Sequence, residues 1–206
     1  TARKWNSVPT VSGRRSIVNI RPFPKHIPTQ SVSEDARMRT VALYAPSKTF
    51  NLAGLVGSYH IIYDARLRDR VCAVSNKTHY NEMNVLSMHA LIGAYQPQGY
   101  EWVDELNQVL AGNIEYFCDY VDEHFEGVSY SRPQGTYMVF LDCTEWCREH
   151  GRDIQWLLDE GARVGVGYQD GRPFHGPCHI RVNLALPLSR VREACDRLDH
   201  YVFNAR

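Results

Sequence analysis

One lysine, Lys48, lies between an apolar run and a glycine-containing turn, and its placement constrains the fold more than any other feature. The run Val41 to Tyr44 is apolar and typical of a strand, and Gly54 follows in the turn. Lysine is strongly hydrated and seldom ends a buried strand. Where it does, desolvation and neighbouring cations turn its amine into a nucleophile for a carbonyl group. We therefore expect Lys48 to lie in a dry pocket, the alternative being a surface lysine in a polar turn.

Further motifs follow in order along the chain. The lysine lies in the motif Ser-Lys-Thr-Phe-Asn-Leu-Ala-Gly. The later motifs occupy residues 57–62, 90–95, 133–142, 174–176 and 179–185. In this order they resemble the PLP-dependent class I/II aminotransferase family, of fold type I, and within it the bacterial cystathionine β-lyase or C–S lyase branch. Several ordered motifs are more specific than any single one. The resemblance covers about residue 26 to the C-terminus and corresponds to the C-terminal half of such an enzyme.

The resemblance implies an α/β fold made of the end of the large-domain sheet and a small α+β domain. We expect a basic leader or arm at 1–25, because the start of the chain carries arginines and lysines but no acid. The C-terminal part of the large PLP-binding domain would then cover 26–108. The small C-terminal domain would cover 109–206.

Hydrophobic periodicity and capping residues predict the elements. Asp64 is a plausible N-cap, and Pro97 cannot continue the helix that precedes it. We expect strands at 39–45 (buried), 56–62, 136–141, 163–166 and 179–184, and helices at 64–75, 82–95, 100–124, 154–160 and 188–203.

Three site residues follow from the resemblance. Lys48 would bond covalently to pyridoxal 5'-phosphate (PLP) and later move the substrate α-proton, and Ser47 would donate a hydrogen bond toward the cofactor phosphate. Arg181 would bind the substrate carboxylate, because a planar guanidinium matches two carboxylate oxygens. An exposed edge-strand arginine is the alternative for Arg181. Asn183 is expected to be a structural hydrogen-bonding residue.

Other family features have no counterpart here. The acid that pairs with the cofactor's pyridine nitrogen would fall near residues 13–16, which contain no Asp or Glu. The upstream glycine-rich phosphate loop, the ring-stacking tyrosine and an asparagine are also unmatched. We therefore expect the C-terminal half of an enzyme, joined to an unrelated basic leader.

The first functional hypothesis is α,β-elimination on a sulfur amino acid, giving pyruvate, ammonia and a thiol. Val56 stands where many aminotransferases have a phosphate-binding arginine, and this departure favours the lyase branch. The alternatives are an aminotransferase on the same scaffold, or a truncated, non-catalytic remnant that dimerises.

Composition limits the partners and the cellular compartment that we expect for this chain. The 23 basic and 23 acidic residues balance, which predicts no strong attraction to nucleic acid or membranes. The chain has no apolar run long enough to cross a bilayer. Its six cysteines are scattered, which favours free thiols in a reducing cytoplasm and no metal site. We expect a cytoplasmic homodimer that acts on an amino-acid substrate.

Overall fold

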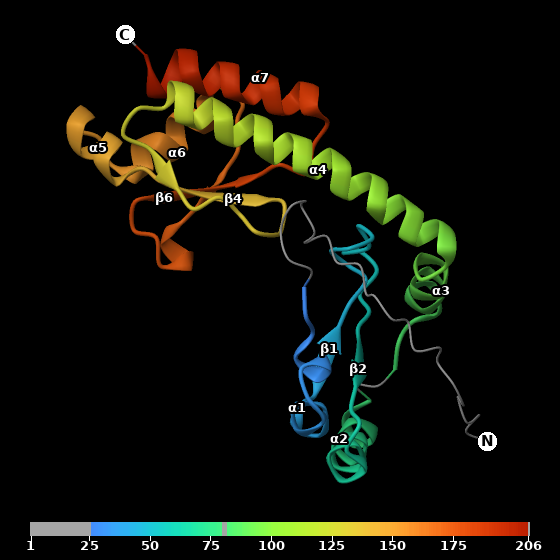
Figure 1. The fold of residues 1–206 in the computed structure, drawn as a ribbon. Coiled ribbons are helices and arrows are strands. Elements are labelled where there is room, and N and C mark those ends of the chain that lie inside the picture. The colour runs from blue at the N-terminus through green and yellow to red at the C-terminus, as the bar shows by residue number, and fades with distance from the viewer. Residues whose placement is uncertain (1–25, 80–81, 206) are drawn as a thin grey trace. The chain divides into compact units, whose positions relative to one another are not determined.

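The computed structural model describes residues 26–79 and 82–205, and these form two compact units (Figure 1). The N-terminal unit ends at Asp104 and the C-terminal unit begins at Glu105. Both of these residues lie within one 28-residue helix, α4 (Pro97–His124), so the boundary falls inside that helix. The leader expected at 1–25 lies outside the described residues.

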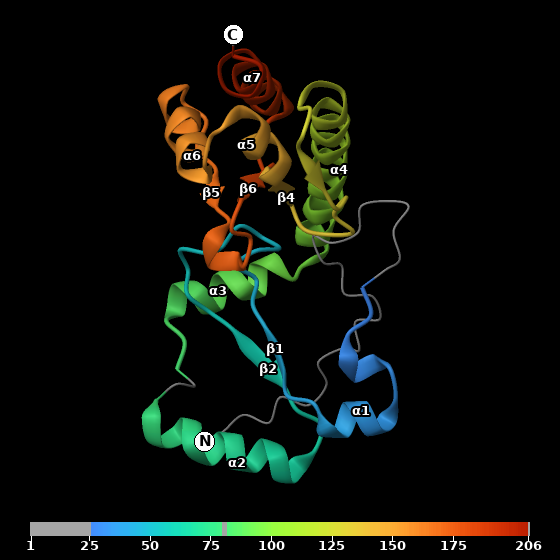
Figure 2. The same cartoon turned by 90° about the vertical axis from the view of Figure 1, so that its left-hand side faces the viewer.

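The N-terminal unit combines short strands with peripheral helices. β1 and β2 pair antiparallel, with Leu43 opposite His60, and Figure 2 shows them as a narrow ribbon. The other elements are helical: η1 (Thr29–Ser31), α1 (Glu34–Arg39), α2 (Ala65–Thr78), α3 (Val85–Ala94) and the first turns of α4; the strands are β1 (Ala42–Tyr44) and β2 (Tyr59–Ile61).

Side-chain caps fix where the two middle helices begin. Asp64 Oδ1 accepts a hydrogen bond from Leu67 N–H at 2.7 Å, and Asn84 Oδ1 accepts one from Ser87 N–H at 2.9 Å. Each bond satisfies an N–H that has no partner inside its helix. The predicted helices at 64–75 and 82–95 are confirmed, with ends shifted by up to three residues. Pro97 opens α4, a position where its missing N–H costs nothing.

The prediction of a buried strand at 39–45 is wrong in extent and in burial. β1 has three residues, and the side chain of Leu43 is 75% exposed. β1 pairs with β2 alone among the described residues. A two-stranded ribbon covers little of its own surface, so its apolar side chains stay in contact with solvent.

The C-terminal unit is an antiparallel sheet with its α-helices packed on one face (Figure 1). The strand order is β3-β4-β6-β5. The strands are β3 (Ser129–Tyr130), β4 (Met138–Asp142), β5 (Gln169–Asp170) and β6 (His179–Asn183); the helices are α5 (Thr144–His150), α6 (Ile154–Arg163), η2 (Arg172–Phe174), α7 (Leu188–Leu198) and a π-helical turn, η3 (Asp199–Phe203).

Alternation along β4 and β6 separates the two faces of this sheet. Val139 and Leu141 of β4, with Ile180 of β6, point into a core completed by α4, α5, α6 and α7. The residues between them, Phe140 and Arg181, are partly exposed and lie opposite each other on the other face. Arg181 is therefore presented on the sheet face away from the helices.

The prediction of a strand at 163–166 is wrong. α6 continues to Arg163, and Gly165 then takes a left-handed conformation with φ of +78°. Val166 N–H donates to Gly161 O at 2.8 Å, which closes the helix end in a reversed turn. The strand forms later, as β5 at Gln169–Asp170. α5 was not predicted.

Candidate active site

Lys48 lies in a tight turn directly after β1. Phe50 N–H donates to Pro46 O at 2.9 Å and Leu52 N–H donates to Ser47 O at 3.0 Å, so the segment forms a single helix-like turn. Asn51 then takes a left-handed conformation with φ of +52°, which asparagine tolerates better than most residues. These bonds hold Ser47 and Lys48 side by side on a defined piece of backbone.

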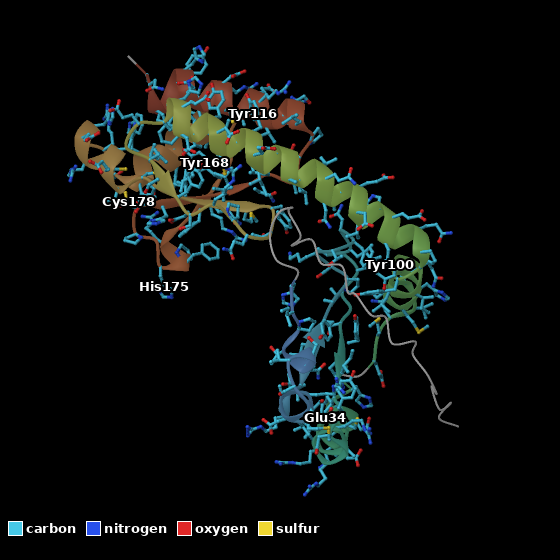
Figure 3. The ribbon with its side chains drawn as sticks, viewed as in Figure 1. Glu34, Tyr100, Tyr116, Tyr168, His175 and Cys178 are labelled. Atoms are coloured by element: carbon cyan, nitrogen blue, oxygen red, sulfur yellow. The ribbon has the colours of Figure 1, made fainter. Side chains whose placement is uncertain are left out.

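An aromatic cluster anchors this turn to the rest of the N-terminal unit. The buried ring of Phe50 meets Tyr95 edge-on at 5.1 Å between centroids and Tyr100 at 6.5 Å. Tyr59 of β2 contacts Tyr95 edge-on and also through a 3.1 Å hydrogen bond between their hydroxyls. Figure 3 labels Tyr100 near the start of α4. The cluster ties the lysine turn to β2, the end of α3 and the start of α4.

The side chain of Lys48 is exposed within this unit, and Ser47 is half-buried. The expected dry pocket around Lys48 is therefore wrong for the described residues. The reason is local: Pro46 and Phe50 take the buried positions of the turn, and Lys48 takes an outward one. In the described parts of the chain, no carboxylate lies within ion-pair distance of Lys48, so its amine is not committed to a structural contact.

Arg181 lies in the middle of β6, flanked by strands on both sides. Its neighbours in register are Phe140 of β4 and Gln169 of β5. Its guanidinium lies 4.6 Å from the centre of the Phe174 ring, a cation–π distance. Within residues 26–79 and 82–205, no carboxylate lies within ion-pair distance of it. The structure therefore presents a partly buried, aromatic-flanked guanidinium whose hydrogen-bond donors can take an anion.

The loop before β6 packs closely on this region. His175 takes a left-handed conformation with φ of +61°, and Figure 3 labels it on that loop. A Cβ on Gly176 would lie 2.5 Å from the Phe140 ring and 2.6 Å from the His179 ring, closer than atoms pack. Only glycine allows this approach, which places Phe174 beside Arg181.

A second polar pair, Asp142 and His179, lies on the same sheet face, two residues along the strands from Phe140 and Arg181. His179 Nε2 is 3.7 Å from Asp142 Oδ2, and the two residues are opposite each other in register. Burial pushes the pKa of Asp142 upward, but hydrogen bonds from the Thr144 hydroxyl and N–H and the charge of His179 outweigh it, leaving the pKa below its ordinary value. Asp142 Oδ1 accepts the Thr144 N–H at 2.9 Å, at the first residue of α5.

Asn113 of α4 fixes the chain that leaves β6. Its side chain is 1% exposed and donates to Leu184 O at 2.9 Å and to Leu186 O at 2.7 Å. Asn183 Oδ1 accepts the Ala185 N–H at 2.9 Å, so its predicted structural role is confirmed. The sequence analysis missed both Asn113 and Phe174. An asparagine on the apolar side of a long amphipathic helix was the available signal for Asn113.

Ser47 and Lys48 thus lie together in the N-terminal unit, and Arg181 lies in the C-terminal unit. All six cysteines are free. Within the described ranges, no group of three or more His, Cys, Asp or Glu side chains has the arrangement of a metal site. None of the described helices is both long and apolar enough to span a bilayer.

Comparison with known protein families assigns the chain to one of them. Residues 12–198 match the family "Aminotransferase class I and II". The chain belongs to this family, and the resemblance read from its motifs is confirmed.

The curated relatives point to one branch of the family. The chain is 32% identical over 171 residues to Protein MalY of Escherichia coli K12, a match that covers 82% of this chain and 42% of MalY. It is 28% identical over 177 residues to cystathionine beta-lyase PatB of Bacillus subtilis 168, covering 84% of this chain and 44% of PatB. The chain therefore spans less than half the length of these relatives and corresponds to their C-terminal part.

A solved structure confirms the fold class. Cystalysin from Treponema denticola, a structure that contains pyridoxal 5'-phosphate, matches with a TM-score of 0.74 and 27% identity over 86% of this chain and 45% of its own. The described residues thus have the fold of the C-terminal part of a fold-type I PLP enzyme. The predicted domain bounds at 108 and 109 stay a prediction.

Proposed function

We propose that this chain contributes three residues to the active site of a PLP-dependent C–S lyase: Lys48, Ser47 and Arg181. The reaction is α,β-elimination on a sulfur amino acid, which consumes water and yields pyruvate, ammonia and a thiol. The observation that carries the proposal is the lysine turn, in which backbone hydrogen bonds and the Phe50 ring hold an amine that has no ion-pair partner among the described residues. Family membership supports the same function.

The residues in this turn fit a PLP site. Lys48 offers an accessible amine that can bond to the cofactor's aldehyde, and Ser47 offers a neighbouring hydroxyl for the phosphate. PLP supplies an electron sink that stabilises negative charge at the substrate Cα. We expect the pocket walls around Lys48 to come from parts of the fold beyond the described residues.

Lys48 has a second role in this proposal. When its Nζ is not bonded to the cofactor, the neutral amine takes the proton from the substrate Cα. The bond from Cβ to sulfur then breaks, and sulfur leaves as a thiolate that takes up a proton. An amine anchored by the backbone bonds of the 46–52 turn can return to the same position after each transfer.

Arg181 orients the substrate. Its two terminal N–H groups can donate to both oxygens of an α-carboxylate, and the Phe174 ring lies against the guanidinium and limits its rotation. The pair Asp142–His179 lies next along the same sheet face. The Asp142 carboxylate accepts hydrogen bonds from Thr144 and lies near His179, so it is already occupied and leaves Arg181 available to the substrate carboxylate.

The test is a product assay with L-cystathionine and PLP. Elimination yields pyruvate and ammonia without any 2-oxo acid as co-substrate. Amino transfer, the second candidate, requires a 2-oxo acid acceptor and releases no ammonia. Val56, in place of a phosphate-binding arginine, favours elimination.

A protein that stays colourless with PLP and releases neither product would leave only the third candidate, a non-catalytic module that dimerises. We also propose that the active protein is a cytoplasmic homodimer, which light scattering of the purified protein and fractionation of its source cells would test.

A further inference from the structure

Three cysteines come together where β4, β6 and α5 meet. Cys143 directly follows β4 and Cys178 directly precedes β6, and Cys143 N–H donates to Cys178 O at 2.9 Å. This bond continues the pairing of the two strands one residue beyond Asp142 and His179. Cys147 N–H donates to Cys143 O at 2.9 Å, so Cys147 lies one helical turn further on, in α5. Cys143, Cys147 and Cys178 are named here the thiol cluster.

The members of the thiol cluster differ in exposure. Cys143 and Cys147 belong to the core of the C-terminal unit and are 0% and 5% exposed. Cys178, labelled in Figure 3, packs against that core and is partly exposed. Of the three thiols, that of Cys178 is therefore the one that a small reagent can reach from solvent.

Cys147 is the buried thiol that contacts Cys178. Burial, followed by a side-chain hydrogen bond with Cys178, raises the pKa of the Cys147 thiol to about 12. Burial also raises the pKa of the Cys143 thiol, on which the other two cysteines act through charge. A thiol with a raised pKa stays protonated and reacts slowly with oxidants. The two buried thiols are therefore protected until a neighbouring sulfur has been oxidised.

A partly exposed thiol in contact with a buried one is the arrangement of a reactive cysteine and its resolving cysteine. We propose that Cys178 and Cys147 form a site of reversible thiol oxidation, at which a peroxide converts the pair to an intramolecular disulfide. The disulfide joins α5 to the residue that directly precedes β6. This inference concerns the C-terminal unit and does not rest on the proposed lyase function.

The oxidation proceeds in two steps. The Cys178 thiolate attacks one oxygen of hydrogen peroxide, the O–O bond breaks, and the departing hydroxide takes up the thiol proton as water, leaving a sulfenic acid. The Cys147 sulfur then attacks the Cys178 sulfur and the S–O bond breaks. The Cys147 proton leaves with that oxygen as a second water. In total the two thiols lose two electrons and two protons, and the peroxide is reduced to two waters.

The test treats the reduced, folded chain with one equivalent of hydrogen peroxide and measures its intact mass. The expected result is a loss of two hydrogens that a dithiol reductant restores. Tryptic digestion without reduction should then yield peptides joined through Cys147 and Cys178. The two cysteines fall in separate peptides, because Arg148 and Arg163 lie between them.

Single variants identify the two partners. Cys178→Ala should abolish the loss of two hydrogens, and circular dichroism should show an unchanged fold because this side chain is only partly buried. Cys147→Ala should leave Cys178 without a resolving thiol, so that Cys178 gains one or two oxygens instead. Cys143→Ala removes the third thiol of the cluster and is the matched control, which should still form the disulfide. Cys72→Ala, at an exposed position in α2, should also still form it.

Three results would overturn the proposal: a disulfide between Cys143 and Cys178, a disulfide only between two copies of the chain, or no disulfide at all. Addition of oxygen to Cys178 in the unmodified chain, with Cys147 left as a thiol, belongs to the last of these. A chain that forms the Cys147–Cys178 disulfide but releases no pyruvate from L-cystathionine would leave this inference standing and would count against the lyase function instead.

Discussion

At the scale of single residues, Arg181 differs from most arginines of its unit in its surroundings. Arg172 pairs with Asp170 at 2.7 Å, and Arg163 pairs with Glu160 at 2.6 Å, both near the protein surface. Arg181 instead lies against the ring of Phe174. An aromatic contact holds a guanidinium in place while leaving its hydrogen-bond donors available, which a carboxylate-binding residue requires.

Arg181→Lys should therefore weaken the binding of an amino-acid substrate about 10- to 100-fold, because a bidentate charged contact is replaced by a single point charge. The PLP-loaded protein, titrated with the amino acid and followed by absorbance, measures this. Arg192→Lys is the matched control, since Arg192 also lies over an aromatic ring, that of Tyr116 at 5.2 Å. Equal affinities for both variants would contradict the role of Arg181.

A second prediction for a single residue concerns Asn113 and the stability of the fold. Asn113→Leu should lower the free energy of unfolding by about 2 kcal/mol, because the buried carbonyl of Leu184 and the partly buried bond to the Leu186 carbonyl lose their donor. Urea unfolding measures the change. Asn183→Ala, which removes only a local bond to Ala185 N–H, should cost about 1 kcal/mol or less. A larger loss in Asn183→Ala would contradict the assignment.

At the scale of elements, α5 depends on the carboxylate that precedes it. Because the pKa of Asp142 is lower in the folded protein, its ionised form stabilises the fold. That contribution is complete above the carboxyl's ordinary pKa of 3.8 and is lost as pH falls through the lower folded value. Asp142→Asn should therefore show a shallower loss of stability in acid, measured by urea unfolding from pH 6 to pH 2. Identical slopes would contradict this.

Elements with local signals could be predicted from the sequence, and contacts between distant residues could not. Asp64 and Asn84 lie three residues from the N–H groups they cap, so short-range pattern was sufficient for α2 and α3. Gly165 ended α6 in a left-handed turn that the apolar residues around it did not reveal. The Asn113 contact joins residues 71 apart in the chain, and no periodicity indicates such a partner.

The same distinction applies to the site. The order of motifs makes Lys48, Ser47 and Arg181 the candidates, because each lies in a specific sequence motif, and their roles stay a prediction. The exposure of Lys48 could not be predicted, since the burial of a strand end depends on which other strands surround it. Phe174 could not be assigned either, because its contact with Arg181 depends on the close packing at Gly176.

At the scale of the whole molecule, the two units have unequal cores. The C-terminal unit has a contiguous core that draws on four helices and the two central strands, whereas the described N-terminal unit buries few apolar side chains. Stability follows buried apolar area, so we expect the units to differ in stability.

Leu157→Ala should lower the stability of the C-terminal unit by about 2–5 kcal/mol, because Leu157 is fully buried in that core. Hydrogen exchange followed by mass spectrometry should show faster exchange in α7 and unchanged exchange in α2. Equal acceleration in both helices would show that the chain unfolds as one cooperative unit, against this prediction.

The most direct test of the central claim is to locate the lysine that reacts with PLP. The chain has four lysines, Lys4, Lys25, Lys48 and Lys77, and a borohydride-reduced adduct fixes the cofactor to whichever one bonds to it. Peptide mass spectrometry after reaction with one equivalent of PLP should place the adduct on Lys48, and Lys48→Ala should carry little of it. An adduct shared evenly with Lys77, an exposed lysine of α2, would contradict the account.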